Sequence, residues 1–275
     1  MKPSFLVGML CSGENERGDA VAALKGQRFT DWELVSLENL PNKQAHDELY
    51  QMFMEEAGNF SHFLKLDADM VLRRDTALRE ILDVFDRVPG LDWLMLDVQD
   101  WYSNTLIPGL QIFSNRVRWA ANADMLMVDH APRFPGCQLR LSEPPAPVVD
   151  HSPNPSSLQA FRFGVHRALK ALQLDRARAA RQVDKAMVHW RILDSVWRHY
   201  RVDPDRRLAL AIAGAEFVMG GGMPDFRFDY MHPGLETLLS KRFEPMSGDE
   251  LLAYVGPAWD DPGRNESRWS ARSSE

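Results

Sequence analysis

The sequence predicts an α/β protein: a mainly parallel sheet with helices on both faces, followed by a helical C-terminal extension. The first observation is a regular alternation of apolar, strand-length runs with segments of helical spacing over the first hundred residues. The second is that polar side chains directly follow three of these runs, at the sheet edge where ligands usually bind. The third is nearly continuous helical spacing from Leu158 onward.

The elements of the first half alternate without interruption. Helices that link parallel strands cover both faces of a sheet, so the strands between them are expected to be buried. Asp75 is expected to cap the third helix, and Pro89 and Gly90 to end it. The expected strands are 4–11, 32–39, 62–72 and 91–98, and the expected helices are 17–27, 42–58 and 74–90.

The second half is organised differently. Between residues 101 and 155 the apolar pieces are short and broken by prolines. Two or more helices are expected over 158–200, and another over 203–219 with Asp203 or Asp205 near its cap. We therefore expect one domain over 1–155, a helical region over 156–260 and a disordered tail over 261–275, which is rich in Asp, Arg and Ser.

Composition narrows the function classes. A net charge of −7 disfavours nucleic acid as the main partner, because binding phosphates requires a basic face. No apolar run approaches the roughly 18 residues of a membrane span. The first residues resemble a strand more than a signal peptide, and Cys11 and Cys137 are too few for a disulfide framework or a cysteine zinc site. We expect a cytoplasmic protein.

Two aspartates follow the third apolar run. If this strand continues, Asp67 and Asp69 point to the same side, and a hard divalent cation such as Mn²⁺ or Mg²⁺ would neutralise them. A D-x-D pair alone is a weak signal, because a second one, at Asp203 and Asp205, lies at an expected helix start. The alternative interpretation is that the first pair caps the next helix or forms ion pairs with nearby arginines.

A cation held by two side chains is expected to have another protein ligand. His151 ends the short apolar piece 146–151, from which its side chain can return to the same edge of the sheet. By itself, a histidine after a strand is more commonly a hydrogen-bonded surface residue. The sequence leaves both interpretations open.

Three segments resemble family 2 glycosyltransferases with the GT-A fold: 24–39, 63–72 and 122–151. The resemblance extends over about residues 4–155 and implies transfer of a sugar from a nucleoside-diphosphate sugar, with UDP expected, to a hydroxyl group of a saccharide or glycolipid. It implies that Asp67, Asp69 and His151 hold Mn²⁺ or Mg²⁺. Glu38 takes the place of an aspartate that contacts the nucleotide in this family.

The resemblance also suggests a base and a nucleotide pocket. An inverting reaction needs a carboxylate that accepts the proton of the attacking hydroxyl. Asp124 is the first candidate because it matches the acid on the acceptor side, and Asp100 is the second because it precedes Trp101, which can stack on a sugar. The expected nucleotide-binding residues are Cys11, Ser12, Glu14, Glu38, Lys43 and Asp67.

Other functions compete with glycosyl transfer. A nucleotidyltransferase would also use carboxylate-bound magnesium, but the acidic segment after the first strand disfavours triphosphate binding. A non-catalytic nucleotide-binding or scaffold protein is the third alternative. The basic segment 161–182 is partly amphipathic, so peripheral contact with the inner face of the cell membrane is a further hypothesis.

Overall fold

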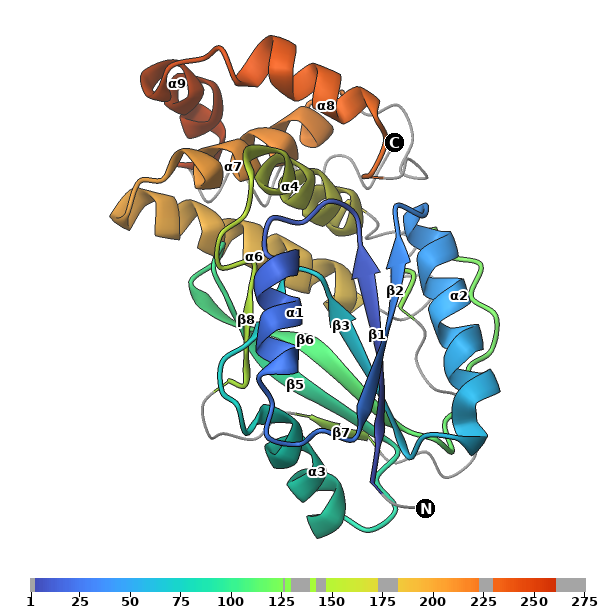
Figure 1. Ribbon diagram of the computed structural model, residues 1–275. Helices are drawn as coiled ribbons and strands as arrows, with labels where there is room; N and C mark the ends of the chain where they lie inside the picture. Colours follow the sequence, from blue (N-terminus) through green and yellow to red (C-terminus); the bar gives the residue numbers. More distant parts are fainter. Residues whose placement is uncertain are drawn as a thin grey trace. The chain divides into compact units, whose positions relative to one another are not determined.

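The computed structural model (Figure 1) describes residues 3–125, 127–129, 139–141, 147–172, 183–222 and 230–260. The chain divides into two compact units, and each is described by itself. The first unit contains residues 1–101 and 105–154, and the second contains residues 102–104 and 155–275. The α/β character of the first part and the helical character of the second are confirmed. The predicted disordered tail lies outside the described residues.

One sheet forms the centre of the first unit. β1 (Phe5–Cys11) is parallel to both of its neighbours, β2 (Trp32–Glu38) and β3 (His62–Asp67). β3 pairs antiparallel with β6 (Thr105–Ser114), which pairs antiparallel with β5 (Trp93–Asp100). The sheet is therefore mixed, and the expectation of a mainly parallel sheet is not confirmed. The reason is local: β6 follows β5 after a short turn and runs back along it, as strands of a hairpin do.

The strand expected at 62–72 is two strands. β3 ends at Asp67, the chain turns, and β4 (Met70–Leu72) pairs antiparallel with β8 (Val149–His151). β8 and β7 (Leu139–Leu141) both run parallel to β5. The two aspartates of the D-x-D pair thus lie at different places, one at the end of β3 and one in the turn that leads to β4.

Helices cover both faces of this sheet, as predicted (Figure 1). α2 (Asn42–Glu55) lies on the face of Gly8, where a Cβ atom would be only 2.1 Å from the Leu49 side chain. α3 (Ala77–Arg87) lies on the opposite face, where the ring centroids of His62 and Phe85 are 4.5 Å apart. α1 (Arg17–Lys25) packs against β4.

The face under α2 changes character along the strands. Phe63 of β3 and Phe113 of β6 are register partners, and both are fully buried in an aromatic cluster with Phe53 of α2. Two residues nearer the carboxyl end of β3, the next partners on this face are Lys65 and Gln111. An apolar core thus gives way to a buried polar layer on the same face.

His62 is expected to make stability depend on pH. Burial lowers the pKa of His62 to about 4, whereas an unfolded histidine titrates near 6.5. The unfolded chain therefore binds more protons between these values, and stability falls as the pH drops from about 6.5 to about 4, by up to about 1.4 kcal/mol per pH unit. Urea unfolding of the wild type and His62→Gln across this range measures the difference. Parallel pH curves for the two proteins would contradict the prediction.

The second unit is helical. α7 begins after Asp205, whose carboxylate accepts a hydrogen bond from the Arg207 amide at 2.7 Å, so Asp205 is the predicted cap and Asp203 is not. Among the described residues, no helix combines the length and apolar character needed to cross a membrane. Residues 173–182 of the basic segment lie outside the described residues. The helices are α4 (Ser157–Ala171), α6 (Val183–Val202), α7 (Arg206–Met219), α8 (Gly234–Leu238) and α9 (Gly248–Trp259).

Two glycines allow α4 and α7 to touch backbone to backbone. A Cβ atom on Gly164 of α4 would lie 1.7 Å from the carbonyl oxygen of Ala211. A Cβ atom on Gly214 of α7 would lie 2.3 Å from the carbonyl oxygen of Phe161. Because both obstacles are backbone atoms, no side-chain rotation can make room for a larger residue.

Candidate active site

The carboxyl ends of β1, β2 and β3 are level with one another. Cys11 pairs with Glu38, and Leu10 pairs with Asp67, so the strands bring these residues to a common edge. The sequence predicted this convergence from the alternation of strands and helices alone. Ser12 and Glu14 follow β1 at the same edge, and Asp69 follows β3.

Asp69 and His151 lie together, although they are far apart in the chain. Nε2 of His151 is 3.4 Å from Oδ2 of Asp69. The pairing of β4 with β8 produces this contact, because Met70 and His151 are register partners. The sequence predicted that the His151 side chain lies at the same edge of the sheet as the D-x-D pair. Its position beside Asp69 agrees with this prediction.

Asp100 holds the other side of the same ring. It is fully buried, and its Oδ1 lies 2.6 Å from Nδ1 of His151. A carboxylate only accepts hydrogen bonds, so Nδ1 carries the proton in this contact, and the Nε2 position is turned toward Asp69. A histidine oriented by a carboxylate in this way is typical of metal-binding histidines.

Ser152 holds Asp69 through two hydrogen bonds. Its hydroxyl donates to Oδ2 of Asp69 at 2.7 Å, and its backbone amide donates to the Asp69 carbonyl, also at 2.7 Å. Ser152 has φ +48°, a left-handed conformation that is uncommon for a residue other than glycine. Such strain is concentrated at functional sites, and nothing in the sequence pattern indicated this residue.

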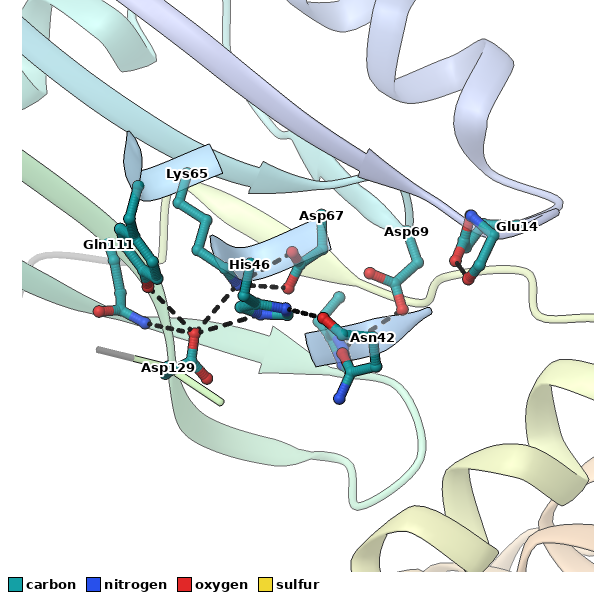
Figure 2. Close-up of polar contacts among 11 residues, drawn as sticks. Glu14, Asn42, His46, Lys65, Asp67, Asp69, Gln111 and Asp129 are labelled. Carbon is teal, nitrogen blue, oxygen red and sulfur yellow. Dashed lines mark hydrogen bonds and ion pairs between the residues drawn. The ribbon is translucent and has the colours of Figure 1, made fainter. Parts of the chain in front are cut away.

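Asp67 has a different partner. Figure 2 shows Lys65 between Asp67 and Asp129. The Lys65 ammonium lies 3.0 Å and 3.2 Å from the two carboxylate oxygens of Asp67. The sequence analysis missed this pair, which a lysine inside an otherwise apolar run could have indicated, since a buried ammonium requires a carboxylate. The neighbouring arginines pair elsewhere, Arg73 with Asp150 and Arg74 with Glu80.

The residues expected to bind the nucleotide are held by polar contacts or buried. Glu14 accepts hydrogen bonds from the amide and the hydroxyl of Ser12. Burial raises the pKa of Glu14, with a further contribution from Asp69, while the Ser12 hydrogen bonds oppose the shift. Burial raises the pKa of the Cys11 thiol to about 11, so it is an unreactive thiol at neutral pH. Glu38 pairs with Arg17, and Lys43 pairs with Asp47.

Asp124 lies in a compact turn with no helix or strand. Its Oδ1 accepts a hydrogen bond from the Met127 amide at 2.9 Å, and its own amide donates to the side-chain oxygen of Asn122. The Asn122 side chain in turn donates to the Met127 carbonyl at 2.7 Å. The turn fixes the carboxylate of Asp124 with respect to its own loop. The catalytic role of Asp124 stays a prediction.

The residues fit a divalent cation in part. In the part of the chain that the structure describes, no group of three or more His, Cys, Asp and Glu side chains is arranged to hold a metal ion. Asp69 and His151 form a pair instead, and two neighbouring ligands of an octahedral ion with bonds of about 2.1 Å lie about 3.0 Å apart. Magnesium-type sites commonly use one or two protein ligands, with substrate phosphates and water in the other positions.

Comparisons with known proteins found similarity in structure and none in sequence. No family model matches the chain. No curated protein matches either. Among solved structures, residues 1–349 of S. aureus TarS are similar, with a TM-score of 0.32 and 11% identity over 98% of this chain and 92% of that chain. A likeness of this strength does not assign a fold or a function.

Proposed function

We propose that this protein is a metal-dependent glycosyltransferase of the GT-A type that transfers a sugar from a nucleoside-diphosphate sugar, with UDP expected, to a hydroxyl group of a saccharide or glycolipid. The observation that supports the proposal most is the pair of Asp69 and His151. Asp69 follows one apolar run in the sequence, His151 ends another, and the two side chains lie 3.4 Å apart. The resemblance of these segments to family 2 glycosyltransferases implies that the pair binds a metal ion.

The protonation of His151 supports a cation at this pair. Because Nδ1 donates its proton in the hydrogen bond to Asp100, a neutral His151 turns the lone pair of Nε2 toward the Asp69 carboxylate. Two electron-rich atoms at this distance repel each other unless a positive charge, either a proton on Nε2 or a metal ion, lies with them. Mn²⁺ or Mg²⁺ would supply that charge and, when bound with the donor, would balance the negative charge of the diphosphate leaving group.

We assign different roles to the other carboxylates. Asp100 orients His151 and is buried too deeply to receive a proton from an acceptor hydroxyl, so Asp124 is the proposed base for an inverting reaction. Asp67 is proposed for the nucleotide side, because its oxygens already accept from Lys65 and its side chain is 33% exposed. Ser12, Glu14 and Glu38 complete the proposed nucleotide edge.

Binding of UDP with Mn²⁺ tests the proposal. Calorimetry on the wild type is expected to show UDP binding that depends on Mn²⁺, because Asp69 supplies a ligand of the ion. Asp69→Ala is expected to lose the Mn²⁺ dependence, whereas Asp83→Ala, a surface control on α3 that removes only a pair with Arg79, is expected to keep it.

The outcomes separate the three candidate functions. No metal-dependent nucleotide binding by the wild type would falsify the transferase proposal. Release of UDP from a nucleotide sugar in the presence of acceptors supports it. Release of pyrophosphate from a nucleoside triphosphate and a sugar phosphate would instead identify a nucleotidyltransferase, and binding without turnover of any donor would identify a non-catalytic protein.

A further inference from the structure

One carboxylate oxygen outside the Asp69–His151 pair is surrounded by polar side chains. Figure 2 shows Asp129 with dashed lines to several side chains that converge on its Oδ1 atom. Four groups lie at nearly equal distances from this atom. They are Lys65 Nζ at 3.4 Å, Tyr50 Oη at 3.4 Å, Gln111 Nε2 at 3.4 Å and His46 Nε2 at 3.5 Å, and we call these four residues the donor cage.

The donor cage is rigid, whereas the carboxylate that it receives comes from an irregular segment. His46 and Tyr50 stand on α2, Lys65 on β3 and Gln111 on β6, and each of these four residues is at least nine-tenths buried. Asp129 is 44% exposed and lies among residues 115–129, whose described part contains no helix or strand. The regular elements therefore fix the place of the carboxylate, and not the reverse.

Charge makes the cage specific for an anion. Burial alone would lower the pKa of Lys65, but the carboxylates of Asp129 and Asp67 outweigh it and raise the pKa overall, so the ammonium stays charged. Nδ1 of His46 lies 2.8 Å from the Asn42 carbonyl oxygen, which only accepts, so Nδ1 carries a proton. Nε2 then attracts Asp129 only when it is protonated as well.

Residues on both sides of the Asp124 turn are held by the rest of the first unit. Before the turn, Trp119 is buried, and its ring lies 5.0 Å from those of Tyr50 and Phe113. After the turn, Val128 is buried and Asp129 enters the donor cage. The turn that carries Asp124 lies between these two anchors. The positions of Trp119 and Asp129 therefore determine the position of Asp124.

We infer that Asp129 is a positioning residue whose carboxylate, held in the donor cage, fixes the segment that carries Asp124. The inference rests on the proposed function, in which Asp124 is the base. Lys65 also makes the link to the donor side, because the same ammonium binds Asp129 and Asp67. Lys65 therefore connects the segment that carries Asp124 with the proposed nucleotide edge.

Kinetics of Asp129→Asn test this role. The asparagine keeps the size of the side chain but removes the charge that the cage binds. We expect kcat to fall about 10- to 100-fold, since a misplacement of about 1 Å at a reacting group has effects of this size. The KM for the sugar nucleotide is expected to stay within about twofold. Asp83→Asn on α3 is the control, with both constants unchanged.

Hydrogen exchange tests whether Asp129 holds the segment, and it does so without an activity assay. The Met127 amide donates to Asp124 within the turn. In Asp129→Asn, peptides that contain Met127 are expected to exchange faster than in the wild type, while peptides from α2 exchange at the same rate. Lys65→Met is expected to produce the same local change, and if that variant does not fold, the Asp129 variant alone decides.

The kinetic and the hydrogen-exchange experiments together distinguish failure of this inference from failure of the proposed function. Unchanged exchange in Asp129→Asn overturns the anchor. Faster exchange with an unchanged kcat overturns the positioning role, because the segment is then released without consequence. If the wild type transfers sugar from no donor, the proposed function fails, and the exchange result still shows whether the cage holds the segment.

Discussion

Asp124→Asn is expected to reduce kcat about 10²- to 10⁴-fold, the contribution typical of a general base. The amide oxygen of the asparagine can still accept the hydrogen bond that the Met127 amide donates to Asp124, so the turn is expected to keep its shape. What the variant loses is the ability to take the proton of the attacking hydroxyl. Initial rates with saturating donor and acceptor measure the loss.

Donor binding is the internal control for this variant. Because Asp69, His151 and the nucleotide edge are untouched, the affinity for UDP with Mn²⁺ is expected to equal that of the wild type. A rate equal to that of the wild type would remove Asp124 from the mechanism. A parallel loss of donor affinity would show that the substitution disturbs the site as a whole, which also contradicts a role confined to proton transfer.

Gly164→Ala is expected to destabilise the second unit by about 3 kcal/mol or more, the upper end of the range for overpacked cores. The added carbon would stand 1.7 Å from the Ala211 carbonyl oxygen, so α4 and α7 must separate over their length. Gly214→Ala on the facing helix is expected to act in the same direction, because its obstacle is the Phe161 carbonyl. Urea unfolding gives both changes.

Gly248→Ala is the matched control in the same unit. It lies at the start of α9, and a Cβ atom there would meet nothing within 4 Å. Its stability is expected to stay within about 0.5 kcal/mol of the wild type, as for most surface substitutions. A Gly164→Ala protein as stable as this control would mean that α4 and α7 do not pack backbone to backbone.

Local patterns predicted most of the helices and strands, because each type has a characteristic spacing of apolar residues. β1, β2, α1, α2 and α3 all lie within the expected ranges. The direction of β6 could not be obtained in this way, since the pattern of a strand is the same whichever way it runs. The break between β3 and β4 was missed because an apolar run lies on each side of the turn, and the two runs were joined across Asp67 and Asp69.

The site was predictable only as far as it depends on strand ends. Asp69 and His151 were identified because each follows an apolar run, and the topology brings them together. The contact between Lys65 and Asp129 depends instead on how an irregular segment returns to the sheet, which no local pattern records. Ser152 was missed because its importance lies in a backbone angle and two hydrogen bonds.

The pairing of β4 with β8 has a consequence for the order of folding. Asp69 is synthesised long before His151 and Ser152, and the contacts that hold it form only when β8 has joined β4 and β5. Contacts between distant parts of a chain form late, because a long loop must close first. A nascent chain that has folded only β1 to β3 thus has the proposed nucleotide edge but lacks His151 beside Asp69. The proposed metal pair is therefore completed in one late step, when β8 docks on β4 and β5.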